Sequence, residues 1–258
     1  METRHTTLFL HGGFGWHCAV ERVWFGDALP VLWWDQPSVA AEPEPYAALV
    51  RNAASGLRAM SASAGAPINL IAHSFGGQLA ATLAAEHGEL IRSITLLGCP
   101  PSPLTAFFHF ARQRLNLSPE RSELKAALTA LEACRDMGSL MTLVQACYPD
   151  GALPDSYFGP DAEDVKTRYF DIASRSPGLD VATFMAVMQD FLHTRPPAPA
   201  NSYAGEVKLL MGLHDPLLSV TEDGDKWLKV FPRAEIQTCQ AGHFVQLELP
   251  PDIWCAEQ

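Results

Sequence analysis

The chain has 258 residues, enough for one large domain or for one domain that carries an insertion. It has 29 acidic residues against 18 Lys and Arg, a formal net charge of −11. This balance argues against a nucleic-acid partner, because phosphate binding needs clustered basic residues. A hydrophobic content of 48% is typical of a globular protein, and no apolar run is long enough to span a bilayer, so we expect no membrane partner.

The cysteines and the first residues bear on compartment and on metal binding. Six cysteines stand at positions 18, 99, 134, 147, 239 and 255, with no CxxC pair, so neither a zinc site nor a disulfide framework is predicted. The stretch METRHTTLFLHGG lacks the basic start, apolar core and cleavage site of a secretory signal. The sequence has no HExxH motif of a metal site, and its glycine-rich stretch HGGFG lacks the GxGxxG form and the lysine of a P-loop that would bind phosphate. We therefore expect a cytoplasmic protein that needs no metal and no cofactor.

Short apolar runs alternate with helical patterns along most of the chain. The predicted strands span residues 6–10, 31–35, 68–74, 93–98, 207–215 and 234–239. Between them lie stretches rich in Ala and Leu, such as residues 46–60 and 76–88, that predict helices. This alternation indicates the α/β class, with a mostly parallel, doubly wound sheet covered by helices on both faces.

The alternation stops between residues 100 and 201. This region shows no strand-like run, and residues 104–117, 121–147, 162–174 and 180–193 predict helices. Proline clusters, CPPSP and RPPAPAN, stand at its two ends. We therefore predict a core formed by residues 1–99 and 202–258, with an all-helical cap at 100–201.

Residues 70–80, LIAHSFGGQLA, place a serine where a predicted strand gives way to a helix. The small residues Ala72 and Gly76 flank Ser74 at two positions on either side, as a sharp strand-to-helix turn requires. Such a turn holds a nucleophile at the top of a sheet. Because a serine hydroxyl is a weak nucleophile at neutral pH, it needs a nearby base that a third group orients.

A base and an acid follow later strands of the predicted sheet. Asp215 follows the apolar stretch VKLLMGL at the end of the predicted strand at 207–215, and His243 comes after the strand at 234–239. The carboxyl ends of parallel strands meet at one edge of the sheet, so Ser74, Asp215 and His243 are predicted to form a catalytic triad. Three other aspartates compete for the acid role but do not directly follow a strand: Asp190, Asp223 and Asp225.

Two backbone amides are needed to bind the negative charge that develops on the substrate oxygen. One is predicted to come from Phe75, the residue after the nucleophile. The second is predicted from the glycine-rich turn HGGFG at residues 11–15, where Gly13 or Phe14 presents an amide without obstruction, and we favour Gly13.

The substrate pocket is predicted from aromatic and flexible side chains near these motifs. Those in the helical insertion could equally form the core of the cap itself. The candidates are Trp16, His73, Phe107, Phe108, Met185 and Phe244.

Four motifs, HGGFG, AHSFGG, GLHDP and AGHF, together resemble those of the α/β-hydrolase superfamily, in the same order along the chain. The helical insertion stands where that family carries its cap. HGGFG with WWDQP is also similar to the prolyl iminopeptidase branch, although DQPSVAAEP lacks the glycines that follow the DQ pair there. The family has two strands before the HG-turn strand, and this chain reaches that strand by residue 6, so we expect the sheet to lack that edge.

The resemblance implies a cofactor-independent serine hydrolase that cleaves esters or thioesters through an acyl-enzyme intermediate. Within the same chemistry, three alternatives stay open: amide cleavage by an aminopeptidase, hydrolysis of a carbon–carbon bond, and acyl transfer or cyclisation in biosynthesis. A non-catalytic ligand-binding protein is an alternative of another class. The expected partner is a small acyl substrate, free or bound to a carrier, and the sequence leaves the oligomeric state open.

Overall fold

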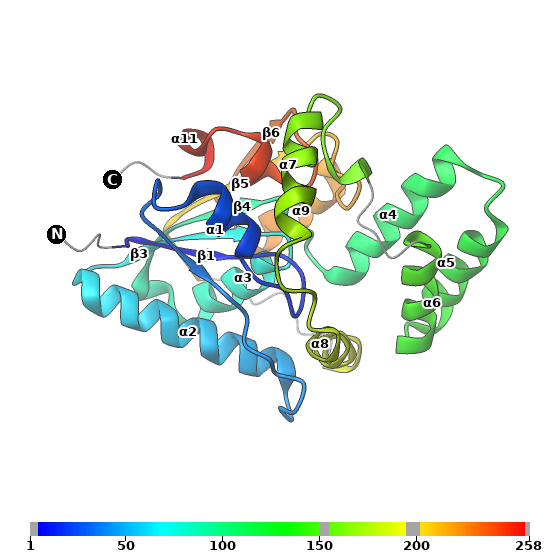
Figure 1. Ribbon diagram of the computed structural model, residues 1–258. Coiled ribbons are helices and arrows are strands. Elements are labelled where there is room, and N and C mark those ends of the chain that lie inside the picture. The colour runs from blue at the N-terminus through cyan, green and yellow to red at the C-terminus, as the bar shows by residue number, and fades with distance from the viewer. Residues whose placement is uncertain (1–4, 150–154, 195–201, 256–258) are drawn as a thin grey trace.

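The computed structural model describes residues 5–149, 155–194 and 202–255. Six strands form one sheet in the order β2-β1-β3-β4-β5-β6, and all neighbouring strands are parallel (Figure 1). The strands are β1 (Thr7–Leu10), β2 (Val31–Trp34), β3 (Ile68–His73), β4 (Ile91–Leu97), β5 (Glu206–Gly212) and β6 (Glu235–Cys239). The predicted parallel sheet is confirmed, and no strand precedes β1 within the described ranges.

Helices cover both faces of this sheet. One face packs against α2 (Pro45–Ala64), α3 (Gly76–His87) and α9 (Val220–Val230), and the other against α1 (Ala19–Phe25), α10 (Val245–Glu248) and α11 (Pro251–Trp254). Successive residues of a strand point to opposite faces, so Leu8 and Leu10 join the first core and Phe9 joins the second. Strands buried on both faces explain why the sequence reads as continuous apolar runs.

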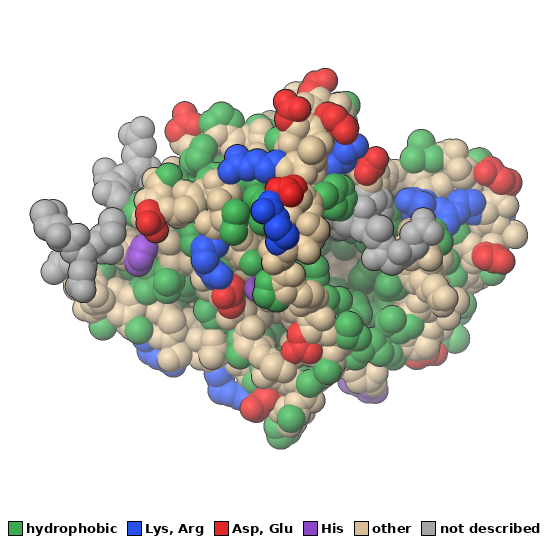
Figure 2. Space-filling model, viewed as in Figure 1, with side chains coloured by type: hydrophobic (Ala, Val, Ile, Leu, Met, Phe, Trp, Pro, Cys, Tyr) green, Lys and Arg blue, Asp and Glu red, His purple; other side chains and the backbone are tan. Residues whose placement is uncertain are grey.

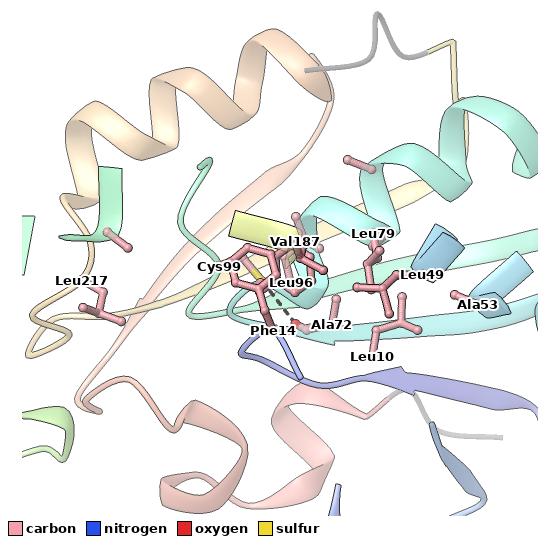
Figure 3. Packing of buried hydrophobic residues seen from close by; sticks show 14 of the residues in the cluster. Leu10, Phe14, Leu49, Ala53, Ala72, Leu79, Leu96, Cys99, Val187 and Leu217 are labelled. Carbon is pink, nitrogen blue, oxygen red and sulfur yellow. Dashed lines mark hydrogen bonds between the residues drawn. The ribbon is translucent and has the colours of Figure 1, made fainter. Parts of the chain in front are cut away.

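The larger core reaches the carboxyl ends of the strands. In Figure 3, Leu10 and Ala72 of neighbouring strands pack near Leu49 and Leu79 of the covering helices. Cys99, just after β4, donates its Sγ–H to Ala72 O over 3.3 Å. This packing fixes the strand ends from which the loops described below emerge.

The region between β4 and β5 is helical in the part that the structure describes. It contains α4 (Pro103–Leu117), α5 (Ser122–Cys134), α6 (Met137–Cys147), α7 (Glu163–Ala173) and α8 (Val181–Thr194). Helices α4, α5 and α6 pack together as a lobe beside the sheet, whereas α7 packs on α1 and α8 on α2 (Figure 1). The predicted end of the cap at residue 201 lies outside the described residues.

One predicted helix, at residues 121–147, is two helices in the structure. Arg135 adopts a φ of +49° and ends α5, and the Asp136 carboxylate then accepts the Ser139 N–H at 2.8 Å to begin α6. An apolar periodicity that continues through a tight turn hides this break. None of the described helices combines the length and the apolar character needed to cross a bilayer.

Candidate active site

Ser74 lies on a strained turn between β3 and α3. Its φ is +51°, a region that residues other than glycine rarely adopt, and its N–H donates to Leu97 O at 3.0 Å. A side chain at Gly76 would run into the backbone carbonyl of Leu10. The turn therefore requires the small residue that the sequence has two positions after the serine.

The glycine-rich turn after β1 approaches Ser74 closely. A Cβ on Gly12 would lie 2.6 Å from the Cβ of Ser74, so a larger residue would displace the serine. Gly13 and Gly15 have φ values of +77° and +65°, which glycine adopts without strain. The predicted oxyanion residues Gly13, Phe14 and Phe75 all line the same cavity as Ser74.

Gln36, two residues after β2, holds this turn in place with both ends of its amide. Its Nε2 donates to Gly13 O at 2.6 Å, and its Oε1 accepts the Gly15 N–H at 2.9 Å. Sequence reasoning noted Gln36 only within the DQ pair and gave it no role. Two hydrogen bonds to alternate residues of one turn fix the direction of the peptide units between them.

His243 and Asp215 meet in the buried interior next to Ser74. His243 Nδ1 lies 2.8 Å from Asp215 Oδ2, and the other carboxylate oxygen, Oδ1, accepts the Leu217 N–H at 2.8 Å. An ionised carboxylate only accepts hydrogen bonds, so His243 Nδ1 carries the proton. In the neutral ring, Nε2 is then free to accept one. Asp215 lies three residues beyond the end of β5.

The backbone around His243 is held from two sides. His243 N–H donates to Tyr157 O at 2.7 Å, and His73 Nε2 donates to His243 O at 2.9 Å. The Glu248 carboxylate accepts the N–H groups of Gly242 at 3.0 Å and Gly159 at 2.9 Å. This carboxylate therefore links the His243 loop to the helical insertion, a contact that no motif in the sequence predicts.

A cavity of about 280 Å³ contains both Ser74 and His243 in its wall. Figure 2 shows apolar side chains gathered in a recess beside the lobe of α4, α5 and α6. No hydrogen bond in the described part of the chain joins the Ser74 hydroxyl to His243. The structure thus places the predicted nucleophile and the predicted base in the wall of one cavity. The hydrogen bond between Ser74 Oγ and His243 Nε2 that proton transfer requires is not formed in it.

The cavity wall includes four of the six predicted substrate-binding residues: Trp16, His73, Phe107 and Phe244. Phe108 and Met185 do not line it, although Phe184 does. Consecutive residues of a helix point about 100° apart, so only one of two neighbours faces the cavity. Sequence reasoning identified these helices but could not fix their rotation.

Burial determines the protonation of two histidines in the cavity wall. It lowers the pKa of His11 to about 4, and burial together with the nearby His243 lowers that of His73 well below its usual value. Both rings are therefore neutral near pH 7. His73 binds the backbone carbonyl of His243, whereas the imidazole ring of His243 is bound by Asp215.

Several polar residues of the cavity escaped the sequence analysis. Tyr148 and Tyr157 share a hydrogen bond between their hydroxyl groups, and Glu21, from the first turn of α1, is also in the wall. Their sequence neighbourhoods carry no motif. Within the described ranges, no group of three or more His, Cys, Asp or Glu side chains could hold a metal ion.

Comparison with known proteins adds the family. The protein-family model described as alpha/beta hydrolase fold matches residues 46–250 of the chain. Among solved structures, a proline iminopeptidase-related protein from Thermus thermophilus is 20% identical, with a TM-score of 0.60, and the alignment covers 97% of this chain and 87% of that one.

Two further structures are similar over nearly the whole chain. An enol-lactonase from Burkholderia xenovorans LB400 is 17% identical, with a TM-score of 0.59 and coverage of 94% and 85% of the two chains. A carboxylesterase from Nitrososphaera gargenis is 16% identical, with a TM-score of 0.55 and coverage of 98% and 88%. No curated protein sequence matches the chain. The family match spans most of the chain and agrees with the sheet and its helices, so the protein belongs to the α/β-hydrolase fold family.

Proposed function

We propose that the protein is a serine hydrolase that cleaves carboxylic esters or thioesters through an acyl-enzyme intermediate. One observation carries this proposal: the strained turn at Ser74 opens on the same cavity as His243, whose Nδ1 is bound to the buried Asp215. A strained residue needs a compensating reason, and presentation of a nucleophile is such a reason.

In the first step, Ser74 Oγ attacks the substrate carbonyl carbon while His243 Nε2 takes the hydroxyl proton. The carbonyl π electrons move to oxygen and form a tetrahedral oxyanion. Asp215 keeps the imidazole in the required tautomer and stabilises its positive charge. When the oxyanion collapses, the bond to the leaving alcohol or thiol breaks, and His243 returns the proton to that group.

The oxyanion requires amide donors at the place where its charge develops. We assign this role to the N–H of Phe75, before the first turn of α3, and to that of Gly13 or Phe14 in the turn held by Gln36. The N-terminus of α3 adds a favourable partial positive charge.

Deacylation repeats the same steps with water. His243 Nε2 takes a proton from a water molecule as its oxygen attacks the acyl carbon, and the proton then passes to Ser74 Oγ as the ester bond breaks. The products are the free acid and the regenerated enzyme.

The mainly apolar wall of the cavity favours esters and thioesters with an apolar acyl chain. Aromatic and aliphatic side chains form most of its wall, among them Phe14, Phe107, Leu179, Phe184 and Leu217. Such a wall binds acyl chains by removing apolar surface from water. Two structural relatives, the carboxylesterase and the enol-lactonase, are named for the cleavage of ester-type bonds, which favours the same substrate class.

A fluorophosphonate probe tests the nucleophile directly. We expect it to label the wild-type protein and to leave Ser74→Ala unlabelled, while the exposed-site control Ser63→Ala is labelled like wild type. Hydrolysis of p-nitrophenyl esters and acyl thioesters should follow the same pattern. Equal labelling of wild type and Ser74→Ala would refute the assignment, and absent labelling of the wild type would favour a non-catalytic ligand-binding protein.

A further inference from the structure

Glu21 is a buried acid in the wall of a mainly apolar cavity. It lies in the first turn of α1, is 6% exposed, and lines the cavity together with Val20 and Tyr169. The ion pairs of the described residues do not include it, and its neighbour Arg22 pairs with Asp35 instead. Burial raises the pKa of the Glu21 carboxyl, because a buried site disfavours its charged form.

One side-chain donor reaches this carboxyl group. Gln246, three residues after His243, donates its Nε2 to Glu21 Oε1 at 3.0 Å. This contact orients the Gln246 amide, because the reverse orientation would set two oxygens against each other. Gln246 Oε1 then has no hydrogen-bond partner in the described structure, although the residue is fully buried.

A second unpartnered acceptor belongs to His11, which lines the cavity together with Glu21. His11 Nδ1 donates to Gly12 O at 2.7 Å, so Nε2 of this neutral ring carries a lone pair and no proton. His11 is 1% exposed, and its Nε2 has no partner among the described residues. A buried acceptor without a donor costs free energy that a bound molecule can recover.

The cavity therefore presents two acceptors from separate segments, the Glu21 carboxylate and His11 Nε2. Gln246 donates to Glu21 from outside the cavity wall, and its own Oε1 has no partner within the described ranges. A purely structural role for Glu21 explains the contact with Gln246 but not why the carboxylate also faces the cavity. Tyr169 and Phe244 also line the cavity, with their rings tilted at 37° and their centres 4.7 Å apart, and the Tyr169 side chain carries a hydroxyl donor.

We propose that Glu21 is a specificity-determining residue that selects substrates with a hydrogen-bond donor, a hydroxyl or an ammonium group, on the part that occupies the cavity beside α1. This inference rests on the proposed ester or thioester cleavage and narrows its substrate class. A donor placed in this part of the cavity compensates the buried carboxylate. A methyl group in the same place leaves the carboxylate unmatched.

The test compares p-nitrophenyl esters of straight-chain acids that end in methyl, hydroxyl or ammonium, over a range of chain lengths. A second series carries the same end groups on the alcohol side of a butyrate ester. For wild type, kcat/KM should favour a donor-bearing ester over its methyl analogue by about tenfold to a hundredfold at one chain length, the range of a hydrogen bond to a charged group. The end group, hydroxyl or ammonium, with the larger preference over methyl identifies the donor that the site selects.

Two variants assign this preference to the carboxylate. Glu21→Gln keeps the shape and removes the charge, so the preference for ammonium should disappear. Glu21→Leu removes the acceptor altogether, so both preferences should fall to about one. Glu222→Gln, at an exposed position of α9, should keep the wild-type ratios. If the leucine variant does not fold, as judged by circular dichroism, the glutamine variant decides through the ratio of kcat/KM for the ammonium ester to that for the hydroxyl ester, which should fall when the carboxylate charge is removed and stay at the wild-type value if Glu21 has no role.

The outcomes separate this inference from the proposed function. Serine-dependent turnover of methyl-terminated esters with no donor preference in either series would overturn the role of Glu21 alone. If no ester is cleaved, the proposed function fails, and calorimetric titration of wild type with the corresponding free acids decides the role of Glu21. Tighter binding of the ammonium-terminated acid that is lost in Glu21→Gln, or of the hydroxyl-terminated acid that is lost in Glu21→Leu, supports it, and equal binding of all three end groups rejects it.

Discussion

Asp215→Asn replaces a carboxylate whose two oxygens both accept buried hydrogen bonds. Oδ1 accepts the Leu217 N–H, and Oδ2 accepts the proton on His243 Nδ1, each at 2.8 Å. An asparagine offers one oxygen and one NH2 group, so it cannot accept from both. If the oxygen faces His243, the NH2 group faces the Leu217 N–H and a buried hydrogen bond is lost, at a cost of about 1–3 kcal/mol.

The other orientation avoids that cost. The NH2 group faces His243 and donates to Nδ1, and the imidazole moves its proton to Nε2. This orientation is favoured because a tautomer change costs less than a buried N–H without a partner. In that tautomer, however, Nε2 cannot take the Ser74 proton, and the carboxylate charge that stabilises the imidazolium is also gone. We expect kcat to fall by about four orders of magnitude, or about 5 kcal/mol of activation free energy.

The assay is steady-state hydrolysis of a p-nitrophenyl ester, together with chemical denaturation. Asp215→Asn should lose most of kcat and keep a free energy of unfolding within about 1 kcal/mol of wild type, because the favoured orientation preserves the hydrogen bonds. Asp225→Asn, an exposed position in α9, is the matched control. A folded Asp215→Asn that keeps more than about a tenth of wild-type kcat would refute the tautomer argument.

Three further changes address the turn and the buried histidines. Gln36→Leu removes both side-chain contacts that hold the glycine-rich turn at residues 11–15, the proposed source of one oxyanion donor, so steady-state kinetics should show kcat reduced by about tenfold to a hundredfold with little change in KM. Gly12→Ala places a methyl group 2.6 Å from Ser74 Cβ, so fluorophosphonate labelling should slow by at least about tenfold, and unchanged labelling would contradict the packing. His11 binds a proton near pH 6.5 when unfolded but near pH 4 when folded, so the free energy of unfolding should decrease as the pH falls through this window, by up to about 3 kcal/mol. Urea denaturation of wild type and His11→Asn at a series of pH values measures this decrease. If the free energy of unfolding falls equally with pH in both proteins, His11 is not its cause.

The sheet could be predicted because its strands are buried on both faces. Each strand therefore appears as a continuous apolar run. The end of one strand was wrong, because the predicted strand reaches residue 215 whereas β5 ends at Gly212 and leaves Asp215 in the following loop. Gly12 and Gly76 mark close backbone approaches, so their places in the sequence also predicted where the chain turns. These signals are local, which is why a single sequence contains them.

Contacts between distant segments could not be predicted in this way. Gln36 binds the glycine-rich turn at residues 11–15, more than twenty residues before it, and Glu21 binds Gln246, 225 residues after it. Neither pair has a spacing that local periodicity can detect. The rotation of α8 is a related case, since an apolar helix offers several faces and only tertiary packing selects Phe184 over Met185 for the cavity wall.

The helical insertion also supports the proposed catalytic base. Tyr157 O accepts the His243 N–H, and the Glu248 carboxylate accepts N–H groups from Gly159 of the insertion and Gly242 of the core. If residues 155–159 moved away, that carboxylate would lose a donor while burial already raises its pKa, and the His243 backbone would lose its partner. Substrate entry should therefore leave this segment in place. Tyr157 both lines the cavity and binds the His243 backbone, so a shift of Tyr157 would change the cavity wall and the position of His243 together.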